Sequence, residues 1–145
     1  MIRSDFITRE IEIFIKSLAN ILLKKEQDQL DEARHEVNST SLNLVGLDIP
    51  MLLTLPGETI LHLMNVTGSF NHMKCYMLAE LLMQEAEIRD LQGNEDSMGL
   101  YERALILFNQ LKPDELDLLI EGDPDAKIKD AISTIELNLN KNKNK

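Results

Sequence analysis

The chain has 145 residues, of which 43% are apolar and 28% are charged, and this size and balance suit one globular domain. Its net charge of −10 repels phosphate backbones and anionic lipid head groups, which disfavours nucleic acid and membrane surfaces as partners. The single cysteine, Cys75, cannot form an intramolecular disulfide, and no stretch reaches the ~18 uninterrupted apolar residues of a membrane span, so we expect a cytoplasmic protein.

The N-terminal third is predicted to form a helical hairpin. Apolar residues recur at spacings of three and four through residues 4–23, which indicates a helix. Additional apolar residues widen this face to more than half of the helix circumference. A charged break over 24–28 precedes a second helix over 29–45. Gly46 can end that helix because glycine adopts left-handed backbone angles without steric cost.

The middle of the chain is predicted to hold a connector and two helices. Residues 47–57 contain Pro50 and Pro56 but are otherwise largely apolar, so we expect an ordered connector that includes a short helix. A helix over 58–67 follows. The strongest periodic segment then predicts a longer helix over 71–92.

Three further helices are predicted toward the C-terminus. Residues 95–111 follow a Gly-Asn break at 93–94 and show the clearest period near 3.6. A short helix is expected over 114–120 and a last one over 124–139. The Lys/Asn segment over 140–145 has almost nothing to bury, so we expect it to be a frayed tail.

Together these segments predict an all-α fold. No run shows the strict alternation of a strand, and aromatic residues make up only 4% of the chain, so the core must consist mainly of Leu, Ile and Met. We expect a single helical domain over 1–139, built from antiparallel helical hairpins that pack as an array or a bundle. More than about 60% of the residues should be helical.

The second predicted helix pair resembles the tetratricopeptide repeat. The small residue Ala86 precedes the break at 93–94, and Tyr-Glu-Arg-Ala-Leu follows over 101–105. In that repeat, small residues let two antiparallel helices approach closely and a large aromatic wedges between successive repeats. The segment over 30–33 (Leu-Asp-Glu-Ala) resembles the start of the repeat's second helix. Ser97-Met98 departs from the pattern, and a generic helical hairpin explains the same residues.

Residues 5–111 also resemble a family of small bacterial helical proteins of unknown function. The shared features are a hydrophobic first helix, an Asp-Glu-Ala segment that leads to Gly46-Leu47-Asp48, and a closing helix pair over 78–111. The resemblance implies a tetratricopeptide-like fold, and it implies no activity.

Few residues suggest chemistry. His35, His62 and His72 lie on three different predicted helices without the spacing of a zinc site, so we interpret them as surface or half-buried histidines. Cys75 lies near His72 and Lys74 but not in a basic environment that would favour a thiolate, and we expect a buried, inert thiol.

Two other groups on the predicted helices have competing interpretations. Glu80, Glu85 and Glu87 lack the Glu-x-x-His spacing of a di-metal carboxylate site, so we expect them to form a solvated face. Four methionines could form an adaptable binding surface, but more simply fill an irregular core: Met64, Met73, Met77 and Met83.

The sequence therefore offers no catalytic, cofactor-binding or metal-binding residues. No cofactor is expected, and an enzyme is the least supported class because no nucleophile, base and orienting group can be assembled. We predict a non-catalytic protein-interaction or assembly module with a protein or peptide partner. The alternative is a regulatory helical domain that binds a small ligand in an enclosed apolar pocket.

Self-association through the N-terminal helix is a further prediction. One side of this helix can pack against the second helix, and the remainder, including some of Ile2, Phe6, Ile13 and Phe14, would form an exposed apolar patch that a homodimer buries. The competing explanation is that the N-terminal helix is the central helix of the fold, covered on several sides by its own chain.

Overall fold

The protein is almost entirely helical. The computed structural model describes residues 2–66, 68–93, 96–117 and 119–143, and side chains only within 6–65, 68–93, 96–117 and 119–141. Helix accounts for 78% of these described residues, which confirms the predicted all-α fold. No helix in the described part of the chain combines the length and the apolar character needed to cross a membrane.

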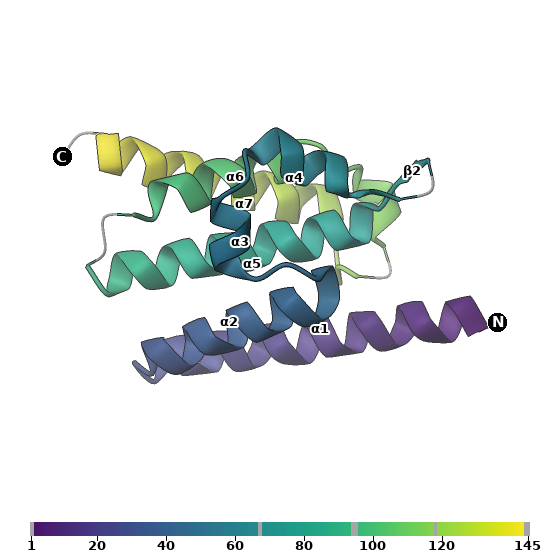
Figure 1. Ribbon diagram of the computed structural model, residues 1–145, viewed down its shortest axis with the longest axis horizontal. Coiled ribbons are helices and arrows are strands. Elements are labelled where there is room, and N and C mark those ends of the chain that lie inside the picture. Colours follow the sequence, from purple (N-terminus) through teal and green to yellow (C-terminus); the bar gives the residue numbers. More distant parts are fainter. Residues whose placement is uncertain (1, 67, 94–95, 118, 144–145) are drawn as a thin grey trace.

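The elements in chain order are α1 (Ile2–Glu26), α2 (Leu30–Val45), α3 (Ile49–Leu53), α4 (Gly57–Leu63), β1 (Asn65–Val66), β2 (Ser69–Phe70), α5 (His72–Leu91), α6 (Met98–Phe108), the 3₁₀ helix η1 (Pro113–Leu116) and α7 (Pro124–Lys143) (Figure 1).

Helices α1 and α2 form the predicted N-terminal hairpin, but α1 is longer than expected. It continues through Lys24 and Lys25 to Glu26, and the turn is confined to the next three residues, where Asp28 has a φ of 59°. The helix can include the two lysines because each forms an ion pair. Lys24 pairs with Glu32 on α2, and Lys25 pairs with Glu87 on α5. Gly46 ends α2 with a φ of 83°, as the sequence predicted.

The connector after α2 contains the expected short helix. Asp48 caps α3 by accepting a hydrogen bond from the backbone N–H of Met51 at 2.9 Å, and Pro50 occupies the first turn, where its missing N–H costs nothing. The polypeptide therefore remains ordered between the hairpin and the rest of the fold.

Helix α4 ends four residues earlier than predicted. Its last residue is Leu63, and the chain then forms a small antiparallel hairpin in which Asn65 of β1 pairs with Phe70 of β2. This hairpin was not predicted, because two-residue strands are too short to show alternation. Only part of α4 faces the core: Ile60 is buried, but Leu63 is 47% exposed.

Helix α5 is the centre of the fold. Thirteen of its 20 residues are buried, since α2 packs on one side and α6 on the other (Figure 1). The side chain of Asn71 caps it by accepting from the N–H of Lys74 at 3.0 Å. The ring of Tyr76 lies edge-on to Phe14 of α1 and to Phe108 of α6, so α5 joins the two hairpins through one aromatic cluster.

The C-terminal elements agree with the predictions less closely at their ends. Helix α6 is shorter than the predicted 95–111, and residue 95 lies outside the described part of the chain. Element η1 takes the place of the first half of the predicted 114–120 helix. Helix α7 packs against α6 and continues to Lys143, into the segment predicted as a tail, whose last two residues are outside the described part.

Candidate functional site

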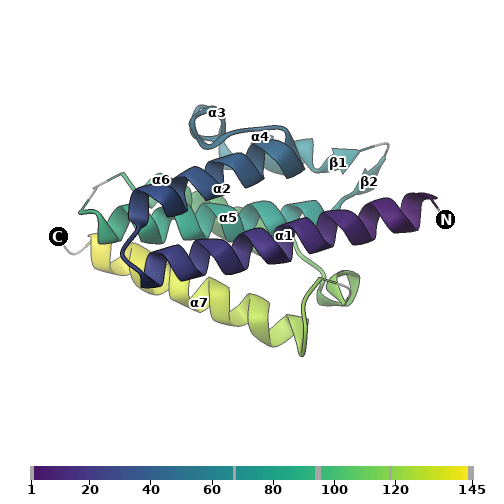
Figure 2. The same cartoon turned by 90° about the horizontal axis from the view of Figure 1, so that it is seen from below.

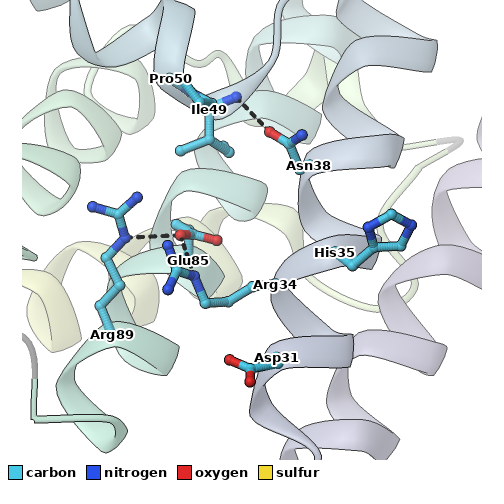
Figure 3. Close-up of a pocket in the computed structure, with 8 residues that line it drawn as sticks. All are labelled: Asp31, Arg34, His35, Asn38, Ile49, Pro50, Glu85 and Arg89. Atoms are coloured by element: carbon cyan, nitrogen blue, oxygen red, sulfur yellow. Dashed lines mark hydrogen bonds and ion pairs between the residues drawn. The ribbon is translucent and has the colours of Figure 1, made fainter.

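A buried polar site joins α2 to α5 through two arginines and one glutamate. Arg34 projects from α2, while Glu85 and Arg89 lie one turn apart on α5 (Figure 3). Glu85 Oε2 accepts hydrogen bonds from Nε of Arg34 at 2.9 Å and Nε of Arg89 at 2.8 Å. The side chains of Glu85 and Arg89 are only 2% and 8% exposed, so two charges are held inside the molecule, and Arg34, which is 33% exposed, reaches them from the edge of the site. Their mutual pairing offsets the cost of removing them from water.

The outer ends of both guanidinium groups also have partners. Arg34 Nη1 donates to the side-chain carbonyl of Gln92 at 3.1 Å, and the amide nitrogen of Gln92 donates to Asp31 at 2.9 Å. Arg89 Nη1 donates to Asp96 at 2.9 Å. The network therefore runs from α2 across α5 to the segment before α6, and it neutralises each arginine with carboxylates of the same chain.

A pocket of about 280 Å³ opens beside this network. Its walls come from one face of α2, the start of α3 and one turn of α5: Asp31, Arg34, His35, Asn38, Ile49, Pro50, Glu85 and Arg89 (Figure 3). The backbone N–H of Ile49 donates to Asn38 Oδ1 at 2.8 Å, which fixes the start of α3 as one wall. Two acidic and two basic side chains line the pocket, so their formal charges cancel. A ligand with a net charge therefore gains little electrostatic attraction there.

Glu80, Glu85 and Glu87 do not form the solvated face that the sequence predicted. Glu85 is buried, and the other two are partly buried. The prediction was wrong because their partners lie far away in the sequence: Arg34 is 51 residues from Glu85, and Lys25 is 62 residues from Glu87. One local signal was available, since Glu85 and Arg89 are four residues apart, the spacing of a helical ion pair.

A second polar contact lies further along the interface with α1. Lys25 donates to Gln84 Oε1 at 2.8 Å and to Glu87 at 2.7 Å. Glu80 lies one turn before Gln84, whose amide group donates to it at 3.5 Å. Burial raises the pKa of Glu80 above the ordinary value of 4.5; the hydrogen bond from Gln84 opposes this rise, and the negative charge of Glu87 adds to it.

Glu80→Gln should therefore change how stability depends on pH. Glu80 binds its proton more tightly in the folded state than in the unfolded state, so the wild type loses stability as pH rises from the ordinary carboxyl pKa through the raised one. Glutamine does not titrate, so the variant does not lose stability in this way. Between the ordinary and the raised pKa, the free energy of unfolding of the wild type should therefore fall relative to that of the variant. Urea midpoints from about pH 4 to about pH 8 measure the difference. Glu136→Gln, at an exposed position of α7, is the control and should stay parallel to the wild type; parallel curves for Glu80→Gln would contradict the expectation.

The histidines lie apart from one another. His35 is exposed at the rim of the pocket, and His62 is exposed on α4. His72, at the start of α5, is half-buried against the ring of Phe70 with centroids 4.7 Å apart, and its Nδ1 accepts from the N–H of Lys112 at 3.4 Å. Among the residues that the structure describes, no group of three His, Cys, Asp or Glu side chains is placed to hold a metal ion.

Cys75 is buried, as the sequence indicated. Its side chain has no exposed surface, and its Sγ–H points to the backbone carbonyl of Leu107 at 3.4 Å. Burial raises the pKa of the thiol to about 12, so at neutral pH it stays protonated and is a poor nucleophile. Three of the four methionines are also buried and the fourth is half-buried, which confirms that they fill the core: Met64, Met77, Met83 and Met73.

The outer face of α1 is the second candidate. Ile15, Leu22 and Leu23 are 51%, 45% and 50% exposed, and Ala19 between them is exposed as well. We call these four residues the α1 strip. Figure 2, which views the molecule from below, places α1 in front of α5 with no other segment across it. The strip is therefore an apolar surface that the described part of the chain leaves open to solvent.

This surface differs from the patch that the sequence predicted. Phe14 is 2% exposed because its ring packs against Tyr76 of α5, and Ile13 is half-buried. Phe6 is 61% exposed, and the side chain of Ile2 lies outside the described residues. Phe6 is thus exposed, as the sequence predicted for some of these four residues, whereas Phe14 and Ile13 lie toward the core. Periodicity on a helix that is apolar around more than half its circumference does not say which side packs.

No family model, no curated protein sequence and no solved structure matches this chain.

Proposed function

We propose that the protein is a non-catalytic protein-interaction or assembly module of the cytoplasm and that the α1 strip is its docking surface. The observation that carries this proposal is the distribution of exposed apolar side chains. Among the described residues, nine large apolar side chains are exposed; α1 holds four of them, of which Ile15, Leu22 and Leu23 belong to the α1 strip and Phe6 does not, and five other helices hold one each. Grouped apolar exposure marks interaction sites, whereas single exposed residues are ordinary.

The position of α1 supports the proposal. The sequence left open whether this helix is central or peripheral, and the central helix is α5, which is buried along most of its length. Helix α1 contacts α2 and α5 only on its inner side, where Ile11, Phe14 and Ile21 are buried. Its outer side keeps apolar residues that a purely peripheral helix does not need.

The chemistry of the interior agrees with a non-catalytic role. The buried carboxylate Glu85 is engaged by two guanidinium groups, and the thiol of Cys75 is protonated and inaccessible. The proposal includes two further points. The α1–α2 and α5–α6 pairs pack like tetratricopeptide repeats, and the protein associates with itself through α1.

Photo-cross-linking in living host cells tests the proposal. p-Benzoylphenylalanine at Ile15 or Leu22 should give protein adducts, because a docked partner lies within reach of the strip. The same group at Lys129, an exposed position on α7, is the matched control and should give few. Adduct yields at Ile15 and Leu22 no higher than at Lys129 would count against a docking surface on α1.

The second candidate function is binding of a small polar ligand in the charged pocket. The observation in its favour is a volume of about 280 Å³ lined by both donors and acceptors. Because two guanidinium groups and two carboxylates balance, the ligand class that fits is a small zwitterion or an uncharged polar molecule. The lining has only Ile49 and Pro50 as apolar walls, however, and it differs from the enclosed apolar pocket typical of small-molecule sites.

A further inference from the structure

We infer that the pocket between α2, α3 and α5 binds a small uncharged carboxamide, which is held by the ion pair of Arg34 and Glu85. The inference rests on the second candidate function, because it names the ligand class of that same pocket. The observations that carry it are the polar atoms that this ion pair leaves open, the balance of charge around them, and the apolar wall formed by Ile49 and Pro50.

The ion pair presents one acceptor to the pocket. Within the described part of the chain, both hydrogen bonds that Glu85 accepts end on Oε2. Every buried side-chain nitrogen or oxygen of the described residues has a hydrogen-bond partner, so Oε1, which accepts none from them, is open to solvent. Figure 3 shows this second oxygen directed away from Arg89, on the side of Asn38 and His35. Because Glu85 is only 2% exposed and lines the pocket, the pocket is the route to this oxygen.

The same ion pair also presents one donor. Arg34 donates from Nε to Glu85 and from Nη1 to Gln92, which leaves Nη2 without a partner among the described residues. The arginine lines the pocket and is 33% exposed, so this nitrogen is open to solvent as well. An open carboxylate oxygen and an open guanidinium N–H therefore belong to two side chains in direct contact. A carboxamide matches them, because it carries N–H donors and a C=O acceptor side by side.

The balance of charge favours an uncharged ligand over a zwitterion. Glu85 already shares its charge with two guanidinium groups, and Arg89 is also paired with Asp96. An ammonium group beside Glu85 would be repelled by both arginines, and a carboxylate beside Arg34 would be repelled by Glu85. Each charged end of a zwitterion would also lose much of its hydration. A carboxamide forms the same two hydrogen bonds without placing another charge in the site.

The size of the pocket and its apolar wall limit the rest of the ligand. A volume of about 280 Å³ lies just below the range of roughly 300–1,000 Å³ that is usual for ligand pockets, so the ligand is small. Ile49 and Pro50 line one side of the pocket. A small ring or alkyl group attached to the carboxamide would pack against them and lose its contact with water.

Nuclear magnetic resonance of the full-length, isotope-labelled protein tests this inference with nicotinamide as the probe. Its carboxamide is attached to a flat ring, and methyl nicotinate has the same ring but an ester without N–H groups. Nicotinamide should shift the backbone amide signals of Asn38, Ile49 and Glu85, with the millimolar dissociation constant expected of so small a molecule. Methyl nicotinate should bind about tenfold more weakly, because Oε1 of Glu85 would face a group that cannot donate. Equal binding of the two compounds, or shifts only outside the pocket, would overturn the inference.

Arg34→Lys tests the donor side of the site. Lysine keeps the positive charge but has no planar guanidinium edge, so the affinity for nicotinamide should fall about tenfold. Arg9→Lys, at an exposed position of α1, is the matched control and should bind as the wild type does. An unchanged affinity in Arg34→Lys would contradict the inference. If Arg34→Lys failed to fold, the comparison of amide with ester would still decide, since it uses the wild-type protein.

A parallel titration with glycine, a small zwitterion, separates this inference from the function on which it rests. If glycine shifts the pocket signals and nicotinamide does not, the inference fails and the second candidate function stands with a different ligand class. If neither compound shifts them, both fail. The docking surface on α1 is tested independently by cross-linking, so neither result bears on it.

Discussion

Glu85→Gln is expected to lower the free energy of unfolding by about 3–5 kcal/mol, the typical cost of removing one partner from a buried ion pair. The glutamine keeps the size of the side chain but removes the negative charge that both arginines share. Arg89, which is only 8% exposed, would keep Asp96 as its charged partner. Asp96 is 69% exposed, so water screens this ion pair and weakens it. Urea denaturation of the two proteins at neutral pH gives the difference.

A matched control comes from a pair with the same spacing on the surface. Asp125 and Lys129 on α7 are also four residues apart and 2.9 Å from each other, but their side chains are 52% and 74% exposed. Asp125→Asn should leave the urea midpoint almost unchanged, since solvent already screens that pair. If Glu85→Gln cost no more than Asp125→Asn, the buried network would not be holding α2 to α5.

Tyr101→Ala is expected to destabilise the protein by about 3–5 kcal/mol, the range for truncation of a large buried aromatic side chain. Its ring is 1% exposed on α6, and its hydroxyl joins three helices. The hydroxyl donates to Asp90 at the end of α5 at 2.9 Å and accepts from the amide of Asn138 on α7 at 3.2 Å. The truncation therefore leaves a cavity and removes a link between α5 and α7.

Two further variants separate packing from hydrogen bonding at this position. Tyr101→Phe keeps the ring but removes two hydrogen bonds, one of them to the carboxylate of Asp90, and should cost about 1.5–3 kcal/mol, the usual range for a hydrogen bond to a charged group. Leu105→Ala, one turn further along α6, should cost less than Tyr101→Ala because Leu105 is only half-buried. Equal denaturation midpoints for Tyr101→Ala and the wild type would mean that the ring is not packed as described.

Local sequence signals predicted a helix end well where that end carries a capping side chain or a glycine. Gly46 ends α2 and Asn71 caps α5 at the predicted places, because left-handed glycine and a side-chain cap act within a few residues. The ends of α1 and α4 were placed less well. At α1 the chain continues through Lys24 and Lys25, whose charges are balanced by residues on other elements. A prediction from neighbouring residues alone cannot take into account partners on other helices.

The composition and the helical period by themselves determined that this protein is all-α, that its methionines and its single cysteine fill the core, and roughly where its helices lie, because helix formation depends on residues three and four apart. Only the tertiary structure decided which side of α1 stays exposed and which glutamate is buried. Phe14 is covered because Tyr76 reaches it from α5, and Ile15, the next residue along, is left open to solvent. Glu85 is buried because Arg34 lies opposite it from 51 residues away. Residues on different helices come into contact only when the helices pack together, so the hydrophobic period of one helix cannot predict these partners.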